Sequence, residues 1–407
     1  MSRTRLPLLS VLPVSVVTAV IAVPFVLGDH PLRWESGSVL PSLVTDDRTT
    51  APGGGSDDDP AGPAAPDTVQ AKVAEEWKEG MPQWGVQLYW EDNADHDQAY
   101  VDKQARIHAD YLVGLHANSV SVSFPFLTGG RTSTEISASE KTPTPERLAS
   151  VLEIFHEAGL RTTVRPLLDE ASLDVPGGDW RGNIEPSDRD AWFTSYEKFL
   201  TPYLKSADGE KAAGFVIGTE LNSMEGDEHW DGVVDRAETI FSGEVAYDAN
   251  WDAYVQGPVS MPVTSLGIDA YFPVKVDDDA SVQTLVDGWN KWLDKKATGP
   301  LPKITIAEAG IGAMDGAYRA PGDFYTKRDV NPEVQANWYT AVCQVVQERR
   351  MSGVYWWSIY FDDDPNTKPD DKVASRLDFA GRPLTEKAIK SCFSSDYAGP
   401  GTDDTSS

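Results

Sequence analysis

Two segments of the sequence, KITIAEAG at residues 303–310 and GFVIGTELN at residues 214–222, each pass from apolar or β-branched residues into a single glutamate. The composition of both segments is typical of strands buried on both faces. Successive side chains of a strand point to opposite faces, so Glu308 and Glu220 each extend a row of small or apolar residues on one face. In a barrel of parallel strands, catalytic side chains come from the carboxyl ends of the strands. The two segments therefore predict two carboxylates at the mouth of such a barrel.

Six further segments have the same short, β-branched and aromatic character, and helical patterns lie between most of them. The eight predicted strands are residues 83–90, 118–126, 160–168, 213–220, 244–250, 265–273, 303–310 and 353–360. Helices are predicted at residues 97–115, 144–159, 187–206, 229–241, 281–296, 331–350 and 385–393. This alternation predicts an α/β protein whose fold is a closed (β/α)8 TIM barrel. The alternative is an open doubly wound sheet, but WGVQLYWED at residues 84–92 lacks the glycine-rich phosphate loop that usually follows the first strand of that fold.

The composition shifts along the chain predict where this domain begins and ends. Residues 1–28 place two arginines before an uncharged stretch about as long as a bilayer is thick, which predicts a signal peptide or, slightly favoured, an uncleaved signal anchor. Residues 29–69 are rich in Gly, Pro and Asp and predict a flexible linker. The barrel is predicted at residues 70–396 and a disordered tail at residues 397–407. We therefore expect an extracytoplasmic protein, secreted or anchored, that contacts the membrane only through its N-terminal segment.

The strongly acidic composition limits the classes of partner. The sequence has 64 Asp and Glu residues against 35 Lys and Arg residues, a formal net charge of −29. Such a field repels nucleic acid and anionic lipid, and no basic stripe offsets it. A neutral or cationic substrate fits better, although acidity also simply confers solubility. The sequence contains no Cys-x-x-Cys pair and no G-x-S-x-G motif, so neither a metal site nor a serine esterase is predicted.

The only two cysteines, Cys343 and Cys392, both fall in the last helical patterns of the chain. Outside the cytoplasm they can form one disulfide if the last two barrel helices are neighbours. The alternative is a pair of separate buried thiols. The sequence leaves both readings open.

Two inward carboxylates on the fourth and seventh strands can bracket a glycosidic bond. In a retaining glycosidase the two carboxyl groups lie roughly 5–5.5 Å apart, one acting as the nucleophile and the other as the acid/base. The motifs IGTELNS (217–223), GIDAYFP (267–273) and ITIAEAG (304–310) resemble clan A of the glycoside hydrolases, and most of all family 113, whose known members are β-mannanases. By position, this resemblance implies that Glu220 is the acid/base and Glu308 the nucleophile.

Several side chains are predicted to support these carboxylates. Tyr271, which shares a face with Asp269 in the predicted strand 265–273, is expected to donate a hydrogen bond to Glu308 and keep it ionised. Arg165, placed at the end of the third strand, is expected to hold the same carboxylate charged. Thr219 stands where most clan A families have an Asn that holds the sugar 2-hydroxyl, and family 113 also has Thr there.

Other residues at the predicted catalytic face are candidates for sugar binding. Trp357 lies on the inward row of the last strand, where its ring is expected to form the floor on which a sugar stacks. Trp90, at the end of the first strand, Asn250, at the end of the fifth, and Asp269, in the sixth, are predicted at the same face as further sugar-binding candidates. The alternative for Trp357 and Tyr271 is ordinary aromatic packing, and for Trp90, Asn250 and Arg165 it is loop scaffolding.

These observations predict an exported, retaining glycoside hydrolase that cleaves the β-linkages of a polysaccharide or oligosaccharide by double displacement. It is expected to act as a monomer, with no metal and no other cofactor. The family 113 resemblance implies β-1,4-mannan as the substrate. The residues themselves leave xylan, glucan, galactan or an envelope glycan open. A non-catalytic carbohydrate-binding barrel is a further alternative, which two facing acids disfavour because a binding protein does not need them.

Overall fold

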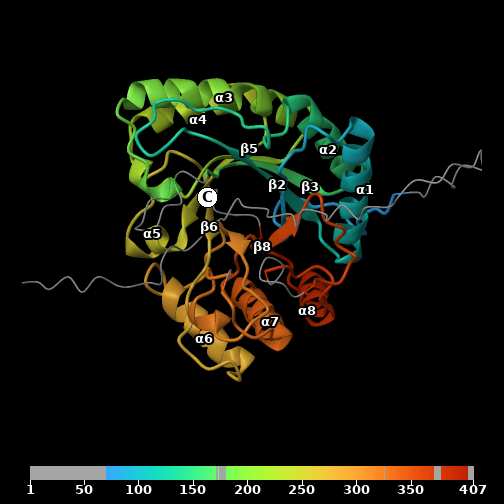
Figure 1. Cartoon of the computed structure of the whole chain (residues 1–407). Coiled ribbons are helices and arrows are strands. Elements are labelled where there is room, and N and C mark those ends of the chain that lie inside the picture. Colours follow the sequence, from blue (N-terminus) through green and yellow to red (C-terminus); the bar gives the residue numbers. More distant parts are fainter. Residues whose placement is uncertain (1–69, 171–172, 174–179, 325, 371–376, 402–407) are drawn as a thin grey trace, which may run out of the picture.

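The computed structural model describes residues 70–170, 173, 180–324, 326–370 and 377–401, and these form a barrel of eight parallel strands. Each strand pairs with its neighbours in chain order and β8 pairs with β1, so the barrel is closed and the (β/α)8 prediction is confirmed (Figure 1). The strands are β1 (Gln83–Tyr89), β2 (Ser119–Phe126), β3 (Arg161–Leu168), β4 (Gly214–Thr219), β5 (Glu244–Asn250), β6 (Ser265–Asp269), β7 (Ile304–Ala309) and β8 (Gly353–Tyr360).

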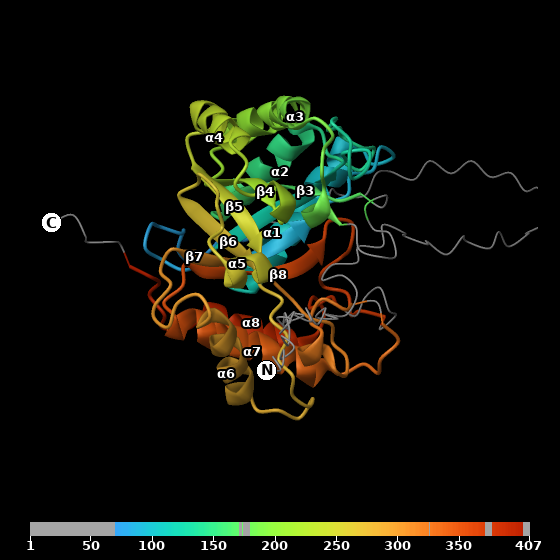
Figure 2. The same cartoon turned by 90° about the vertical axis from the view of Figure 1, so that its left-hand side faces the viewer.

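The α-helices of the described residues pack around this barrel, with α3 and α4 on one side and α6, α7 and α8 on the other (Figures 1 and 2). Several begin where a side-chain oxygen of Asp97, Thr144, Asp188, Ser281 or Asn331 accepts a hydrogen bond from the first turn. The helices are α1 (Gln98–Gly114), α2 (Pro145–Glu157), α3 (Arg189–Gly209), α4 (His229–Ile240), α5 (Trp251–Gln256), α6 (Val282–Leu293), α7 (Pro332–Glu348) and α8 (Pro383–Phe393).

The interior of the barrel is polar over much of its length. Alternating residues of the strands point inward, and on β3 these include Arg161, Thr163 and Arg165. In the amino-terminal half of the barrel, inward side chains such as Arg161, Glu244 and Tyr355 surround a cavity of about 40 Å³. The carboxyl-terminal half is filled by the charged side chains of the candidate site, described below. The apolar core lies mainly between the strands and the surrounding helices.

Strand ends near the mouth differ from the prediction, and the differences have local causes. β6 ends at Asp269, where its register against β7 shifts, so Tyr271 follows the strand rather than belonging to it. β4 ends at Thr219, because Glu220 adopts a left-handed backbone with φ of 53°, which cannot continue a strand. Helix α5 was not predicted, since six residues are too few to show a helical period.

The two cysteines form a disulfide between α7 and α8, with Cα atoms 5.8 Å apart. The bonded alternative for Cys343 and Cys392 is therefore confirmed. The predicted targeting segment at residues 1–28 and the predicted linker at residues 29–69 lie outside the described residues. Among the residues that are described, no helix is both long enough and apolar enough to span a bilayer.

Candidate active site

Glu220 and Glu308 both lie at the carboxyl-terminal mouth of the barrel, and both are fully buried. Glu308 is the last but one residue of β7, and Glu220 directly follows β4. The left-handed turn at Glu220 is held by neighbouring backbone groups. Its own N–H donates to the carbonyl of Asp248 at 2.8 Å, and the next N–H, that of Leu221, donates to the hydroxyl of Tyr247 at 3.0 Å. These two hydrogen bonds hold the left-handed backbone at Glu220 in place. Strained backbone conformations of this kind cluster at functional sites.

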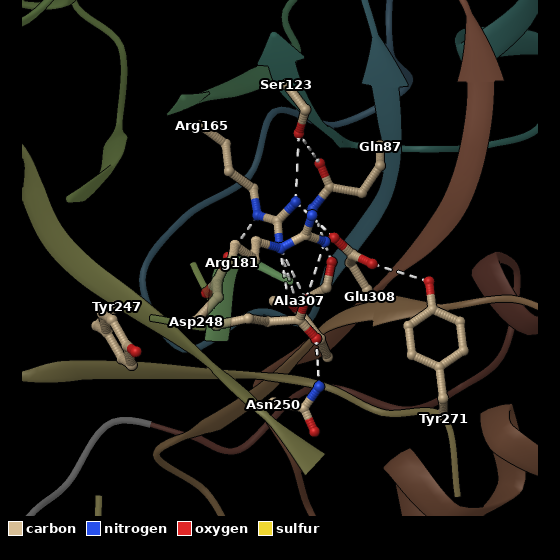
Figure 3. A network of polar contacts seen from close by, with 12 residues as sticks. Gln87, Ser123, Arg165, Arg181, Tyr247, Asp248, Asn250, Tyr271, Ala307 and Glu308 are labelled. Carbon is tan, nitrogen blue, oxygen red and sulfur yellow. Dashed lines mark hydrogen bonds and ion pairs between the residues drawn. The ribbon is translucent and has the colours of Figure 1, made fainter. Parts of the chain in front are cut away.

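Both carboxylate oxygens of Glu308 have a hydrogen-bonding or ionic partner. Arg165 Nη1 lies 2.6 Å from Oε1, and the hydroxyl of Tyr271 donates to Oε2 at 2.8 Å. Figure 3 shows Glu308 between these two side chains. The structure thus brings together three residues that the sequence analysis grouped. β3 ends at Leu168, as the predicted strand 160–168 does, so Arg165 lies three residues before its end. The donors leave the carboxylate in a fixed orientation.

Arg165 is the centre of a larger ion-pair cluster. Its Nε donates to Asp248 Oδ2 at 2.6 Å, and its Nη2 donates to both oxygens of Asp269 at 2.9 and 3.1 Å. Because Arg165 also meets Glu308, one buried guanidinium faces three buried carboxylates. Asp269, predicted as a sugar-binding residue, therefore holds Arg165 in this structure. Burial, followed by the charge of Glu308, raises the pKa of Asp269 well above its ordinary value.

A glycine of the GIDAYFP motif makes room for this cluster. A side chain at Gly267 on β6 would place its Cβ 2.1 Å from Asp248 Oδ1. Only a glycine at this position lets Asp248, on the neighbouring strand β5, reach across the barrel to Arg165.

Glu220 has its own arginine. Arg181 donates from Nε at 3.0 Å and approaches with Nη2 at 2.9 Å, both toward Oε2 of Glu220. The amide of Asn250, the last residue of β5, donates to Oε1 at 2.7 Å. Asn250 was predicted at this face, whereas Arg181 was not predicted. The two glutamates are thus matched, because each has an arginine at one oxygen and a neutral donor at the other.

The sequence model of glycoside hydrolase family 113 matches residues 88–374. The chain belongs to glycoside hydrolase family 113. It is therefore a glycoside hydrolase, and the resemblance seen in the three motifs is confirmed. No curated protein matches the chain by sequence.

Solved structures share the fold of this family 113 protein. A family 113 β-1,4-mannanase matches with a TM-score of 0.63 and 19% identity, over 78% of this chain and 100% of that chain. The family 113 β-mannanase AaManA from Alicyclobacillus acidocaldarius, in complex with ManMIm, matches with a TM-score of 0.58 and 21% identity, over 77% and 97% of the two chains. A family 5, subfamily 18 enzyme from Streptomyces cattleya, in complex with Manβ1-4GlcNAc, matches with a TM-score of 0.51 and 15% identity, over 78% and 82%.

The two glutamates of the family 113 site have different surroundings. Burial raises the pKa of Glu220 to about 7; the charge of Glu308 adds to the rise, while Arg181, Arg165 and Asn250 oppose it. Glu220 can therefore exchange a proton near neutral pH. Glu308 is in direct contact with Arg165 and with the hydroxyl of Tyr271, both of which stabilise a negative charge. The described residues contain no cluster of His, Cys, Asp and Glu suited to a metal ion.

The two predicted tryptophans occupy different places. Trp357, on β8, is buried with its ring centroid 6.0 Å from the guanidinium carbon of Arg165, so it lies against the ion-pair cluster. Trp90 stacks on Phe361, with ring centroids 4.5 Å apart, in the apolar core. This position of Trp90 follows from strand alternation. Gln87 lines the barrel interior, and Trp90, three residues further on, therefore falls on the opposite face.

Two residues of the family 113 site escaped the sequence analysis. Asp248 lies two residues before Asn250 on β5 and therefore shares its face. Counting back from Asn250 by the alternation rule would have identified it. Arg181 begins a short 3-10 helix, Arg181–Asn183, in the long connection between β3 and α3. No local pattern marks such a residue, because it lies outside the strands and the alternation rule does not apply to it.

Proposed function

We propose that this glycoside hydrolase acts with retention, with Glu308 as the nucleophile and Glu220 as the acid/base. The observation that carries the proposal is the pair of buried carboxylates at the ends of β4 and β7, each with an arginine at one oxygen and a neutral donor at the other. In the first step Glu308 attacks the anomeric carbon and Glu220 donates its proton to the leaving oxygen. In the second step Glu220 takes a proton from water, whose oxygen displaces Glu308 from the sugar.

The assignment of the two roles follows from their surroundings. A nucleophilic carboxylate attacks as an anion, and Arg165 and Tyr271 both contact the oxygens of Glu308 as groups that stabilise negative charge. An acid/base must gain and lose a proton during each turnover, which is easiest when its pKa lies near the working pH. The pKa of Glu220, raised by burial to about 7, suits that role.

We further propose β-1,4-mannan, or an oligosaccharide derived from it, as the substrate. The support comes from membership of family 113 and from the shared fold of two family 113 β-mannanases. Trp357, beside the Arg165 cluster, offers an aromatic ring of the kind on which sugar C–H faces stack. The negative charge of the chain is compatible with a neutral polysaccharide.

Export of the enzyme is a separate proposal. It is supported by the arginine-flanked apolar segment at residues 1–28 and by the disulfide between Cys343 and Cys392, because disulfides persist mainly in oxidising compartments. Fractionation of producing cells, with N-terminal sequencing of the exported form, tests both export and anchor cleavage. Enzyme found only in the cytoplasm would refute this part of the proposal.

Azide rescue tests the catalytic roles. In Glu308→Ala, azide is expected to attack the sugar in place of the nucleophile and give a glycosyl azide of inverted configuration. In Glu220→Ala, azide is expected to intercept the covalent intermediate and give the retained β-glycosyl azide. Without azide each variant should lose at least about 10²–10⁴-fold in kcat, the range of general acid–base catalysis. Glu153→Ala, an exposed position on α2, is the matched control and should keep full activity.

The configuration of the first product settles the stereochemistry. NMR observation of the sugar released by the parent enzyme should show the β-anomer before mutarotation, and an initial α-anomer would contradict the proposal. Product analysis with mannan, xylan, glucan and galactan tests the substrate. Cleavage of mannan alone supports the proposed specificity, and preference for another polysaccharide overturns it while leaving the catalytic roles intact.

A further inference from the structure

Arg181 makes the closest charged contact of Glu220, and the double-displacement scheme gives it no role. Its Nε and Nη2 both point at Oε2 of Glu220, at 3.0 and 2.9 Å. A third nitrogen, Nη1, donates to the carbonyl of Leu168, the last residue of β3, at 3.4 Å. The side chain is buried, so this ion pair is screened little by water.

The hydrogen-bond partners of Glu220 fit only one of its two protonation states. Arg181 offers donors and has no acceptor, and Asn250 presents its Nδ2 donor while its oxygen accepts from the backbone N–H of Asp252. A protonated carboxyl must itself donate a hydrogen bond, and neither partner can receive it. The arrangement is therefore complementary to the carboxylate, which is the form that the second step of the reaction needs.

We propose that Arg181 is a positioning residue that holds Glu220 as a carboxylate during hydrolysis of the covalent intermediate. The inference rests on the proposed retaining mechanism. In this step a water oxygen bonds to the anomeric carbon, and the bond from that carbon to Glu308 breaks with its electron pair returning to Glu308. The proton of the water passes to Glu220, which must be ionised to accept it. Arg181 stabilises that ionised state.

The charges around this pair change during turnover in the direction the proposal requires. The other titratable groups that face Glu220 or Arg181 are Glu308, Arg165, Asp269, Asp169, Tyr247, Tyr271 and Tyr89. Once Glu308 becomes an ester, its negative charge no longer opposes ionisation of Glu220. Asp169, hydrogen-bonded by Tyr89, attracts Arg181 from the side of β3, but the two nitrogens of Arg181 lie on Glu220. Arg181 then dominates the field at Glu220.

Kinetics with an activated substrate test the proposal. With 2,4-dinitrophenyl β-mannobioside, or the matching glycoside if the parent enzyme prefers another polysaccharide, the first step needs no acid. Arg181→Met is expected to lower kcat about 10- to 100-fold, the value of a hydrogen bond to a charged group. KM should fall in parallel, so that kcat/KM stays within about threefold. The covalent intermediate should accumulate, giving a burst of dinitrophenol and an added sugar mass on the peptide that contains Glu308.

Two further measurements separate positioning from simple structural support. Azide, a nucleophile that needs no base, should restore kcat of Arg181→Met toward that of the parent. The acid limb of kcat should move to higher pH, because loss of a positive charge raises the pKa of the group that must be ionised. Arg181→Lys, which keeps the charge, should recover part of the rate. Arg106→Met, an exposed arginine on α1, is the control and should change nothing.

The outcomes distinguish this inference from the proposed function. If kcat and kcat/KM of Arg181→Met fall equally, with no burst and no response to azide, the positioning role is wrong while the retaining mechanism stands. If the parent enzyme itself forms no adduct at Glu308 and releases the α-anomer, the proposed function fails and this inference fails with it. If Arg181→Met does not fold, Arg181→Gln and Arg181→Lys are measured in the same way, and unchanged kcat in both overturns the role.

Discussion

Strand β3 carries two arginines on its inward face, Arg161 near the amino-terminal end of the barrel and Arg165 near the carboxyl-terminal end. Arg161 donates to the hydroxyls of Thr163 and Tyr355, at 2.8 and 3.2 Å, and forms an ion pair of 2.6 Å with Glu244. Arg165 meets three carboxylates at 2.6–2.9 Å. Arg161 thus has mainly neutral partners, whereas Arg165, apart from a 3.5 Å hydrogen bond to the hydroxyl of Ser123, has carboxylate partners.

The difference in burial decides what each arginine contributes. The side chain of Glu244 is 39% exposed, so water can solvate its carboxylate if Arg161 is lost. The side chains around Arg165 are 0–4% exposed, so their charges have no such alternative. In barrels of this class the amino-terminal face contributes stability and the carboxyl-terminal face contributes chemistry. The two arginines place this division on a single strand.

The largest effect is expected from Arg165→Met. The substitution leaves the buried carboxylates of Asp248, Asp269 and Glu308 without a counter-charge and removes a donor from the proposed nucleophile. We expect kcat/KM to fall about 10³-fold or more, as for loss of an electrostatic group at a reacting centre. Unfolding in urea should show a free energy lower by about 3–5 kcal/mol, the cost of breaking a buried ion pair from one side. A kcat/KM within tenfold of that of the parent would contradict this expectation. Arg165 would then contribute mainly to stability, as Arg161 is expected to do.

The sequence predicted the contacts at the carboxyl-terminal end of β3 well, because strand alternation is a strictly local rule. It placed Arg165 beside Glu308, and the structure joins the two at 2.6 Å. It also placed Tyr271 on the same carboxylate, although Tyr271 lies two residues beyond the end of β6. The prediction of such contacts stays correct even when the predicted strand is too long, because it depends on which face a residue occupies rather than on where the strand stops.

Strand ends and loop contacts were harder to predict, because they depend on distant parts of the chain. β6 stops at Asp269, where its register against β7 shifts, and no local pattern of residues 265–273 reveals this. Arg181 contacts Glu220 from outside the strands, where the alternation rule gives no guidance. Trp90 was assigned from its place at a strand end, whereas its side chain packs on Phe361.

The second effect concerns two tyrosine hydroxyls, one at each end of the barrel. Tyr271→Phe removes the hydrogen bond to Glu308 and should lower kcat/KM about 10- to 100-fold, the value of a hydrogen bond to a charged group. Tyr355→Phe removes a hydroxyl that donates to Gln83 and accepts from Arg161, and should leave kcat/KM within about twofold. Steady-state kinetics on both variants make the matched test. Equal losses in the two would show that hydroxyls at the amino-terminal end also influence the reaction.

The third effect is a pH dependence expected only at the mouth. Burial raises the pKa of Glu220 to about 7, and the proposed first step needs its protonated form. As pH rises through 7 that form is lost, so kcat/KM on a polysaccharide should fall about tenfold between pH 6 and pH 8. A dinitrophenyl glycoside, whose leaving group needs no proton, should not show this fall in kcat/KM. A fall of the same size with both substrates would assign the ionisation to a group other than the acid/base.

Little effect on activity is expected from Arg161→Met, at the amino-terminal end. The change removes the hydrogen bonds to Thr163 and Tyr355 and the ion pair with Glu244. The hydroxyl of Thr163 stays buried but loses this donor. The free energy of unfolding should fall by about 1–3 kcal/mol, the cost of an unsatisfied buried polar group. Because the mouth is untouched, kcat/KM should stay within about threefold and its pH profile should be unchanged. A loss of activity comparable with that of Arg165→Met, in protein that remains folded, would show that charge in the cavity of the amino-terminal half of the barrel influences Glu308. Stability and chemistry would then no longer divide along β3.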